Sequence, residues 1–165
     1  MKYPLGFLAV LVSLTTQGQT NPFDTLRFDK VVMCDFNEQG EEEIFLVDKN
    51  GRLDKSVTKQ VDLSKETIIE LNKRLGSNSS YVRESRLCFV PHLGFVYYNR
   101  GKVVASIVVC LMCHGLRSSI NIPAQIMDQI EDNGKTLFLT GGMSDSMAEH
   151  MNTLVKSNKF SHSEN

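Results

Sequence analysis

Residues 86–116 read RLCFVPHLGFVYYNRGKVVASIVVCLMCHGL and hold two strand-like runs on either side of Asn99-Arg100-Gly101, a turn signal in which glycine can adopt a positive φ. The first run, residues 87–98, is rich in aromatic and β-branched residues. The second run, residues 102–109, is apolar on both faces, as a covered central strand would be. The stretch therefore predicts a β-hairpin at the centre of a sheet.

This hairpin also predicts that three of the four cysteines lie close together. If the turn has two residues, counting outward from it pairs Cys88 with Cys113. A three-residue turn with a bulge would instead place Cys88 opposite Met112. In either register Cys88 lies beside the pair formed by Cys110 and Cys113. Pro91 cannot donate a ladder hydrogen bond, so the first strand needs an edge or a bulge at that point.

The side chains at the open end of the hairpin match the ligands of a structural zinc site. Cys110 and Cys113 form a CxxC pair, and Cys88 with His92 supplies two more ligands from the facing strand. Four such ligands make the closed tetrahedral set that zinc prefers. Cys34, the cysteine outside the hairpin, is an alternative fourth ligand. The sequence thus predicts a metal site of Cys88, His92, Cys110 and Cys113.

Three other interpretations of the cysteines stay open. Two disulfides would satisfy four cysteines, either with Cys88–Cys113 across the hairpin or as Cys110–Cys113 with Cys34–Cys88. Residues Cys110 to His114 also spell CxxCH, the attachment sequence of haem c, and His114 is a further alternative zinc ligand. A strand followed by CxxC is typical of a thiol–disulfide redox centre. The haem and redox interpretations are weaker, because the motif has neither a helical wrap nor a βαβ context.

The N-terminus predicts export. Lys2 precedes the apolar segment 3–14, which is too short to span a bilayer, and residues 16–18 offer small side chains for cleavage. We therefore expect residues 1–18 to be a signal peptide and residues 19–165 to form a single periplasmic or extracellular domain. No later run is apolar enough for a transmembrane segment. Disulfides are permitted in such a compartment, and a free reactive thiol is unusual there.

Composition narrows the function classes. The chain has 165 residues, of which 18 are Lys or Arg and 19 are Asp or Glu, so no strongly basic face is expected and nucleic-acid binding has no support. Trp is absent, which argues against a stacking platform for bases or sugars. No Ser–His–Asp arrangement, phosphate loop or paired carboxylates can be assembled. We expect a non-enzymatic binding or envelope-associated module whose partner the sequence does not name.

The remaining patterns predict an α+β fold, with an antiparallel sheet of about five or six strands packed against two main helices. Ser64 is a suitable N-cap and Gly76 a suitable C′ residue for the clearest helix, and Ser144 caps the last one. Further strands are expected at 30–36, 41–47, 52–58 and 136–140, helices at 63–76, 124–130 and 144–156, a poorly ordered lead-in at 21–30 and a loop at 117–121.

The hairpin begins with Cys88-Phe89, continues through Pro91, His92 and an aromatic strand that starts at Gly94, and closes with the CxxC pair. In this pattern the chain resembles a group of small, exported, uncharacterised bacterial proteins. The resemblance covers about a third of the chain. It implies a site at the hairpin and no particular activity, because the group has no settled function. Asn is common in the group at the position of His114, which weakens the haem interpretation.

Overall fold

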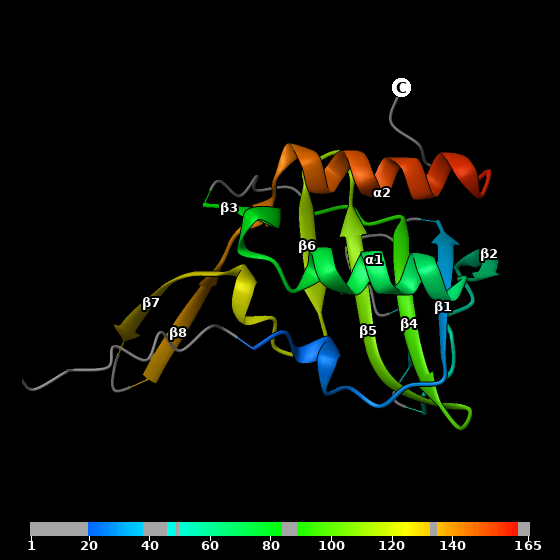
Figure 1. Cartoon of the computed structure of the whole chain (residues 1–165), viewed down its shortest axis with the longest axis horizontal. Coiled ribbons are helices and arrows are strands. Elements are labelled where there is room, and N and C mark those ends of the chain that lie inside the picture. Colours follow the sequence, from blue (N-terminus) through cyan, green and yellow to red (C-terminus); the bar gives the residue numbers. More distant parts are fainter. Residues whose placement is uncertain (1–19, 38–45, 49, 84–88, 133–134, 162–165) are drawn as a thin grey trace, which may run out of the picture.

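The computed structural model describes residues 20–37, 46–48, 50–83, 89–132 and 135–161. Its centre is a five-stranded antiparallel sheet in the order β2-β1-β4-β5-β6, with both main helices on one face (Figure 1). This confirms the predicted α+β class and the antiparallel sheet. The sheet strands are β1 (Lys30–Phe36), β2 (Val57–Asp62), β4 (Leu93–Asn99), β5 (Lys102–Cys110) and β6 (Gly115–Ser118), and the helices are α1 (Lys65–Leu75) and α2 (Asp145–Ser157).

The predicted central hairpin is formed by β4 and β5. Its turn has two residues, Arg100 and Gly101, both with positive φ (51° and 75°), as a type I′ hairpin turn requires. The next pairs expose an error in the predicted count, because Tyr98 faces Val103 but Tyr97 faces Ala105. One extra residue in β5 therefore shifts the register by one position. Extending this register along the sequence would pair Cys88 with neither Cys113 nor Met112.

Both main helices begin where the sequence predicts. The Ser64 hydroxyl accepts a hydrogen bond from the Thr67 N–H, and the Ser144 hydroxyl accepts one from the Met147 N–H. These side chains satisfy backbone donors that the first helical turn leaves without intrahelical partners. The N-caps therefore fix the start of each helix.

Gly76 ends α1 for a reason that differs from the prediction. Its φ is −86°, so the left-handed conformation expected of a C′ glycine is absent. A Cβ at this position would instead lie 2.2 Å from the Asn21 side chain, whose Nδ2 donates to the Asn72 carbonyl. The lead-in segment is ordered as well, because the buried Phe23 ring packs 5.4 Å from the Tyr97 ring. The expected disorder of residues 21–30 is therefore wrong.

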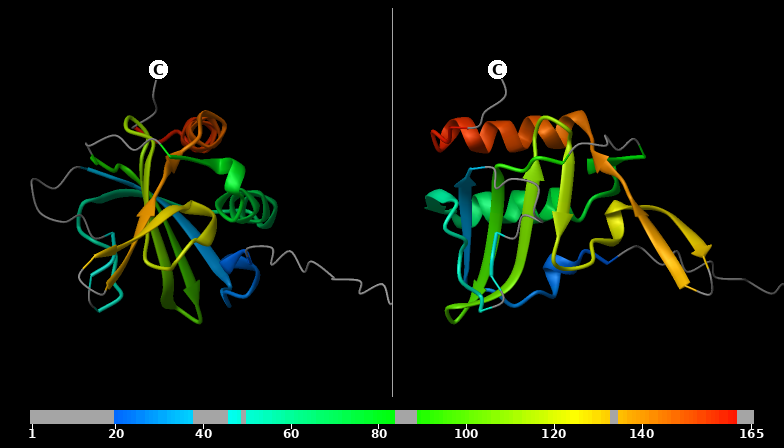
Figure 2. Two further views of the ribbon diagram at one scale, coloured as in Figure 1. Left: turned by 90° about the vertical axis from the view of Figure 1, so that its left-hand side faces the viewer. Right: turned by 180° about the vertical axis from the view of Figure 1, so that it is seen from behind.

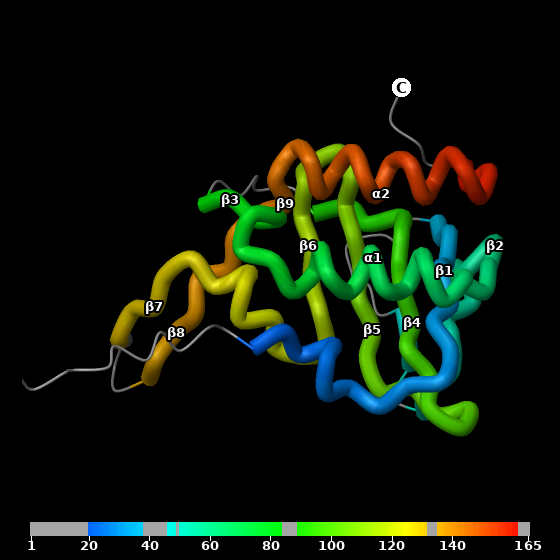
Figure 3. The backbone as a smooth tube through the Cα atoms, in the orientation of Figure 1, coloured from blue at the N-terminus to red at the C-terminus, as the bar shows by residue number. Residues whose placement is uncertain are grey.

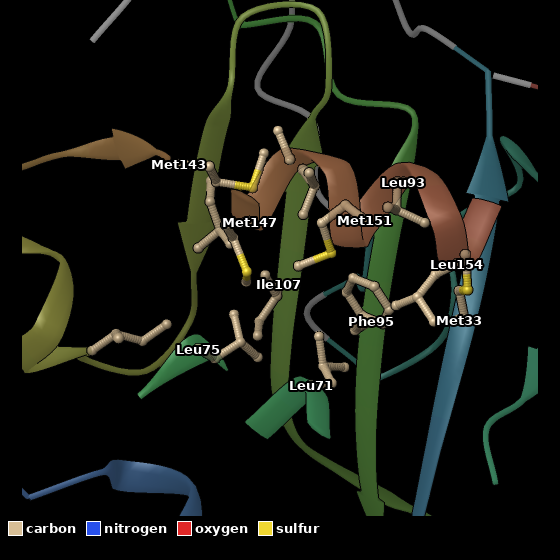
Figure 4. Packing of buried hydrophobic residues seen from close by; sticks show 14 of the residues in the cluster. Met33, Leu71, Leu75, Leu93, Phe95, Ile107, Met143, Met147, Met151 and Leu154 are labelled. Carbon is tan, nitrogen blue, oxygen red and sulfur yellow. The ribbon is translucent and has the colours of Figure 1, made fainter. Parts of the chain in front are cut away.

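The main core fills the space between the sheet and the two helices. Figure 2 shows both helices on the same side of the sheet, and Figure 4 shows three side chains of α2, Met147, Met151 and Leu154, directed at it. The sheet contributes alternate residues, as expected for a strand with two different faces. The fully buried members include Met33, Leu71, Leu75, Leu93, Phe95, Tyr97, Ile107, Val109, Met143, Met147 and Met151.

A second, smaller cluster covers the opposite face of the sheet. Leu46 packs there with Cys34 and Val96, and the backbones of Val47 and Leu53 form an isolated bridge. The expected strand at 41–47 lies mostly outside the described residues. The expected strand at 52–58 is wrong, because β2 begins at Val57, where it pairs with β1.

The segment after the CxxC sequence begins with a short strand, β6, so the predicted loop at 117–121 is wrong for residues 117 and 118 and is confirmed for residues 119–121. Pairing with β5 supplies its backbone hydrogen bonds despite its polar side chains. The expected helix at 124–130 is also wrong. It is replaced by a short 3₁₀ turn (Pro123–Gln125) and β7 (Ile126–Asp132), because β7 pairs along its length with β8 (Lys135–Thr140).

The β7–β8 pair forms an arm that projects beyond the sheet (Figure 3). The arm continues into β9 (Gly142–Met143), which pairs with β3 (Tyr81–Val82) beside the start of α2. The remaining short elements are 3₁₀ turns at Pro22–Asp24 and Asn78–Ser80. Within the described ranges, every helix is too short or too polar to cross a bilayer.

Candidate cysteine and histidine site

The CxxC segment forms the tight turn between β5 and β6. Cys110 is the last residue of β5 and pairs with Gly115, so residues 111–114 connect the two strands. The Cys113 N–H donates to the Cys110 sulfur across 3.4 Å, and both side chains are buried. The motif therefore leads into a strand, whereas the thioredoxin-like context expected of a redox centre has a helix after it.

His92 lies in line with Cys110. Its N–H donates to the Val109 carbonyl (3.3 Å), and its own carbonyl accepts from the Phe36 N–H (3.1 Å). These bonds extend the ladder by one residue beyond the pair formed by Leu93 and Val109. Because side chains alternate along a strand, His92 and Cys110 both lie on the sheet face that α1 and α2 leave uncovered. The backbone register thus places His92 next to Cys110, which already contacts Cys113, another predicted ligand.

The orientation of the His92 imidazole is set by the backbone. Its Nδ1 lies 3.1 Å from the Phe36 carbonyl oxygen. Since a carbonyl only accepts, Nδ1 is the donor of this bond. A ring held in this way is typical of histidines that bind metal through Nε2. The same bond also anchors a histidine with a purely structural role.

Phe89, the residue after Cys88 in the sequence, packs against the CxxC turn. A Cβ at Gly115 would lie 2.7 Å from the Phe89 ring and 3.2 Å from the Cys113 sulfur, so only glycine fits there. The Arg117 guanidinium lies 4.1 Å from the centre of the same ring. Contacts of this kind between an arginine and an aromatic face are favourable. The segment that follows Cys88 therefore meets the segment that carries Cys113.

Cys88 itself lies outside the described residues, so the four-residue site stays a prediction. Among the residues that the structure describes, no three His, Cys, Asp or Glu side chains form a group that could hold a metal ion. That finding does not extend to a group completed by Cys88.

Cys34 lies apart from this cluster. It is fully buried on the same sheet face, where it pairs with Gln60 and Gly94. Two strand spacings and two residue rises separate it from Cys110, or about 12 Å between Cα atoms. That distance excludes a direct disulfide between them, which needs Cα atoms within about 7 Å. Burial raises the pKa of the Cys34 thiol to about 12.

His114 points toward α2. Its φ is +51°, a conformation that glycine and asparagine adopt more readily than other residues. Its Nδ1 lies 3.7 Å from the Asp145 carboxylate, and it lines a surface groove with residues of α2. The other residues that line this groove are Asp145, Ala148, Glu149, Asn152, Thr153 and Lys156.

Two polar groups are buried without a signal in the sequence. Gln125 is 5% exposed, and its Nε2 donates to the carbonyls of Leu116 (2.8 Å) and Gly141 (3.1 Å). His150 is half-buried, and within the described chain its Nε2 has no hydrogen-bond partner. A polar residue in a short 3₁₀ turn and a histidine on an amphipathic helix carry no local signal of burial.

No family model, curated protein or solved structure matches the chain significantly. Its function is therefore inferred from its own residues.

Proposed function

We propose that this protein is an exported, non-enzymatic binding module whose cysteines and His92 hold the fold together. The observation that carries this proposal is the burial of the described cysteines. Cys34 and Cys110 are 0% exposed and Cys113 is 2% exposed. Thiol–disulfide exchange requires an accessible sulfur, so these positions suit a structural role.

The structural site would tie the segment that begins at Cys88 to the turn between β5 and β6. A zinc site fits the His92 ring, which is held at Nδ1 by the Phe36 carbonyl, and the amide bond to the Cys110 sulfur, and zinc would act there only as a structural link. A disulfide between Cys88 and Cys113 is the other form of the same link. The packing of Phe89 against Gly115 supports either form.

The binding role is supported by the β7–β8 arm. Four of its large apolar side chains are between 44% and 57% exposed: Ile130, Leu137, Phe138 and Leu139. Exposed apolar groups gathered on one element indicate an interaction surface. The rest of the sheet, in contrast, is covered on both faces.

Mass spectrometry of the protein from an export-competent host tests this proposal. A mature mass that begins near residue 19 supports export, and an uncleaved chain contradicts it. Zinc lost on denaturation supports the metal form. A deficit of two hydrogens per bridge without metal supports the disulfide form. Four free thiols without metal would contradict the structural site.

A matched pair of variants measures the contribution of the site to stability. Cys113→Ala removes a member of the site in either form, and Cys34→Ala removes a similarly buried cysteine outside it. Loss of a native link in a small exported domain costs about 2–5 kcal/mol. We therefore expect Cys113→Ala to lower the free energy of unfolding clearly more than Cys34→Ala does. Equal losses would contradict the proposed link.

The alternative, a redox protein, makes opposite predictions. Covalent haem at Cys110 and Cys113 would give a visible absorption band and a mass increase that survives denaturation. A dithiol centre would give a thiol that alkylates rapidly in the folded state. His114, the axial ligand that a CxxCH sequence implies, instead faces a groove with charged walls, which supports the structural interpretation.

A further inference from the structure

Among the described residues, the β7–β8 arm has no packing partner along its outer half. In the described part of the chain, each of its two strands pairs only with the other, and every residue of β8 is exposed. Figures 1 and 2 show the arm extending away from the sheet and both helices. A lone two-stranded hairpin is only marginally stable in water. The free edge of β8 is therefore positioned to accept another strand.

The sequence of β8 indicates what that strand is. Residues 136–140 read Thr-Leu-Phe-Leu-Thr, which is the same in both directions. When two copies of such a strand pair antiparallel about Phe138, Thr136 faces Thr140 and Leu137 faces Leu139 of the other copy. Antiparallel pairing of two identical strands is two-fold symmetric, so each contact occurs twice. In this strand the palindrome also matches threonine with threonine and leucine with leucine, and such cross-strand pairs favour sheet formation.

Charge selects β8 over β7 as the paired edge. β7 carries Asp128 and Glu131, whereas β8 carries no acidic residue and only Lys135 at its outer end. Carboxylates brought together by pairing of two β7 strands would repel each other. Asp128 is also engaged already by the Arg83 guanidinium at 3.3 Å. The edge without acidic groups is thus the one suited to self-association.

We propose that the β8 edge is a dimer interface that joins two copies of this chain into a four-stranded sheet in the order β7-β8-β8-β7. Ile130 pairs with Leu137 and shares a face with Leu139, so the two copies would gather six aliphatic side chains on one face. The two Phe138 rings would meet on the other face. The inference names the partner of the binding module proposed above and rests on that proposal.

The size of the interface sets its expected strength. Stable dimers bury about 800 Å² on each partner. One arm of two short strands offers less than that. We therefore expect a dimer that dissociates on dilution, with a dissociation constant of about 1–100 μM.

The test is sedimentation equilibrium over a wide range of concentration, on the protein purified from an export-competent host. Phe138→Glu places two carboxylates on the symmetry axis, and we expect it to weaken association at least about a hundredfold. Phe138→Lys should do the same. An equimolar mixture of the two variants should restore the dimer. Phe138 is 57% exposed, so both variants should keep the wild-type circular dichroism spectrum and melting temperature.

Gln129→Glu is the matched control, because Gln129 pairs with Phe138 but lies on the outer strand. It should leave association unchanged. Two double variants test the register, in which residue 137 of one copy faces residue 139 of the other. A chain that carries both Leu137→Lys and Leu139→Glu should dimerise, because opposite charges face each other. A chain that carries both Leu137→Glu and Leu139→Glu should not. These variants also replace the Phe138 set if that set fails to fold.

Three results would overturn the dimer. They are a monomer at every concentration, an oligomer that Phe138→Glu leaves intact, and a variant mixture that stays monomeric. Mass spectrometry tests export and the state of the cysteines independently of sedimentation. Failure of the dimer prediction would therefore leave the proposals of export and of a structural site standing. Failure of those two proposals would in turn leave the sedimentation result standing.

Discussion

The two hairpins of this protein are both antiparallel strand pairs, but one is buried and the other is exposed. In β4–β5, the central residues Phe95 and Val96 are both fully buried, although they point to opposite faces of the sheet. In β7–β8, Phe138 and Leu139 occupy similar positions and are about half exposed. Backbone pairing is therefore common to both hairpins, and burial distinguishes the core hairpin from the exposed one.

The attachment of the arm explains how an exposed hairpin keeps a defined position. Gln125 joins its base to β6 and Gly141, and Gly141 donates back to the Gln125 carbonyl (2.8 Å). Met127 packs into the same corner, where a Cβ at Gly141 would collide with its side chain at 2.7 Å. The base of the arm is thus part of the body, and only the outer half is displayed.

Replacing phenylalanine by alanine should give the largest difference in the free energy of unfolding between the two hairpins. Phe95→Ala empties a fully buried site between the sheet and α2, and should lower the free energy of unfolding by about 3–5 kcal/mol. Phe138→Ala should change it by less than about 0.5 kcal/mol in dilute solution, because the side chain is already half in water. Urea denaturation of both variants makes the comparison. Similar losses would mean that the arm is packed in solution.

The Gln125 contact should have the next largest effect. Gln125→Ala leaves the Leu116 and Gly141 carbonyls without their donor, which should cost about 1–3 kcal/mol. Hydrogen exchange should show the amides of β7 and β8 losing protection before those of β4 and β5. Gln129→Ala, an exposed glutamine on the same strand pair, is the control and should change neither readout. Equal exchange throughout both hairpins would contradict a local role.

The contrast also explains which parts of the fold could be predicted. The centre was predictable because residues 102–109 are apolar on both faces and Asn99-Arg100-Gly101 is a turn signal. The capped helices were predictable for the same reason: Ser64 and Ser144 act within one turn. In each case the decisive interaction lies within a few residues in the sequence.

The errors all concern interactions between distant residues. Two of the errors depend on how neighbouring strands meet across the sheet. They are the bulge opposite Tyr97 and the strand partner of residues 115–118. The helix predicted at 124–130 is replaced by the pairing of β7 with β8. The candidate site was only partly predictable for the same reason. Ladder bonds place His92 beside Cys110, whereas the predicted count relied on a register that the bulge changes.

The turn of the central hairpin offers a smaller, stabilising change. Arg100 has a φ of +51°, which costs a side chain with a Cβ more than it costs asparagine. Arg100→Asn should raise the free energy of unfolding by about 0.5–1 kcal/mol, because the bond from its N–H to the Asp29 carboxylate is a backbone contact and survives. Thermal unfolding measures the gain. A loss of stability would indicate that the guanidinium makes a contact of its own.

The smallest expected effect concerns pH and the helix that covers the central hairpin. Burial lowers the pKa of His150 below its usual value near 6.5, the nearby Arg74 lowers it further, and Glu70 opposes the shift. The unfolded chain then binds the proton at a higher pH than the folded chain does. The free energy of unfolding should therefore fall as the pH drops through about 6.5, with no change from this residue above that value.

His150→Gln tests the pH effect, because it keeps a polar side chain of similar length that does not titrate. Its urea midpoint should depend less on pH between about 7 and 5 than that of the wild type. The arm lies away from α2, so exchange in β7 and β8 should show no matching pH step. An unchanged slope in the variant would assign the effect to another histidine.

The burial of Cys34 has a practical consequence for studying folding. Its side chain is fully buried with Leu46 in the smaller cluster and its pKa is near 12, so a thiol reagent can reach it only when that cluster opens. The rate at which this one position becomes labelled therefore reports opening of the smaller cluster, and peptide mapping measures it without any engineered probe. Conditions that loosen only the arm should leave that labelling rate unchanged.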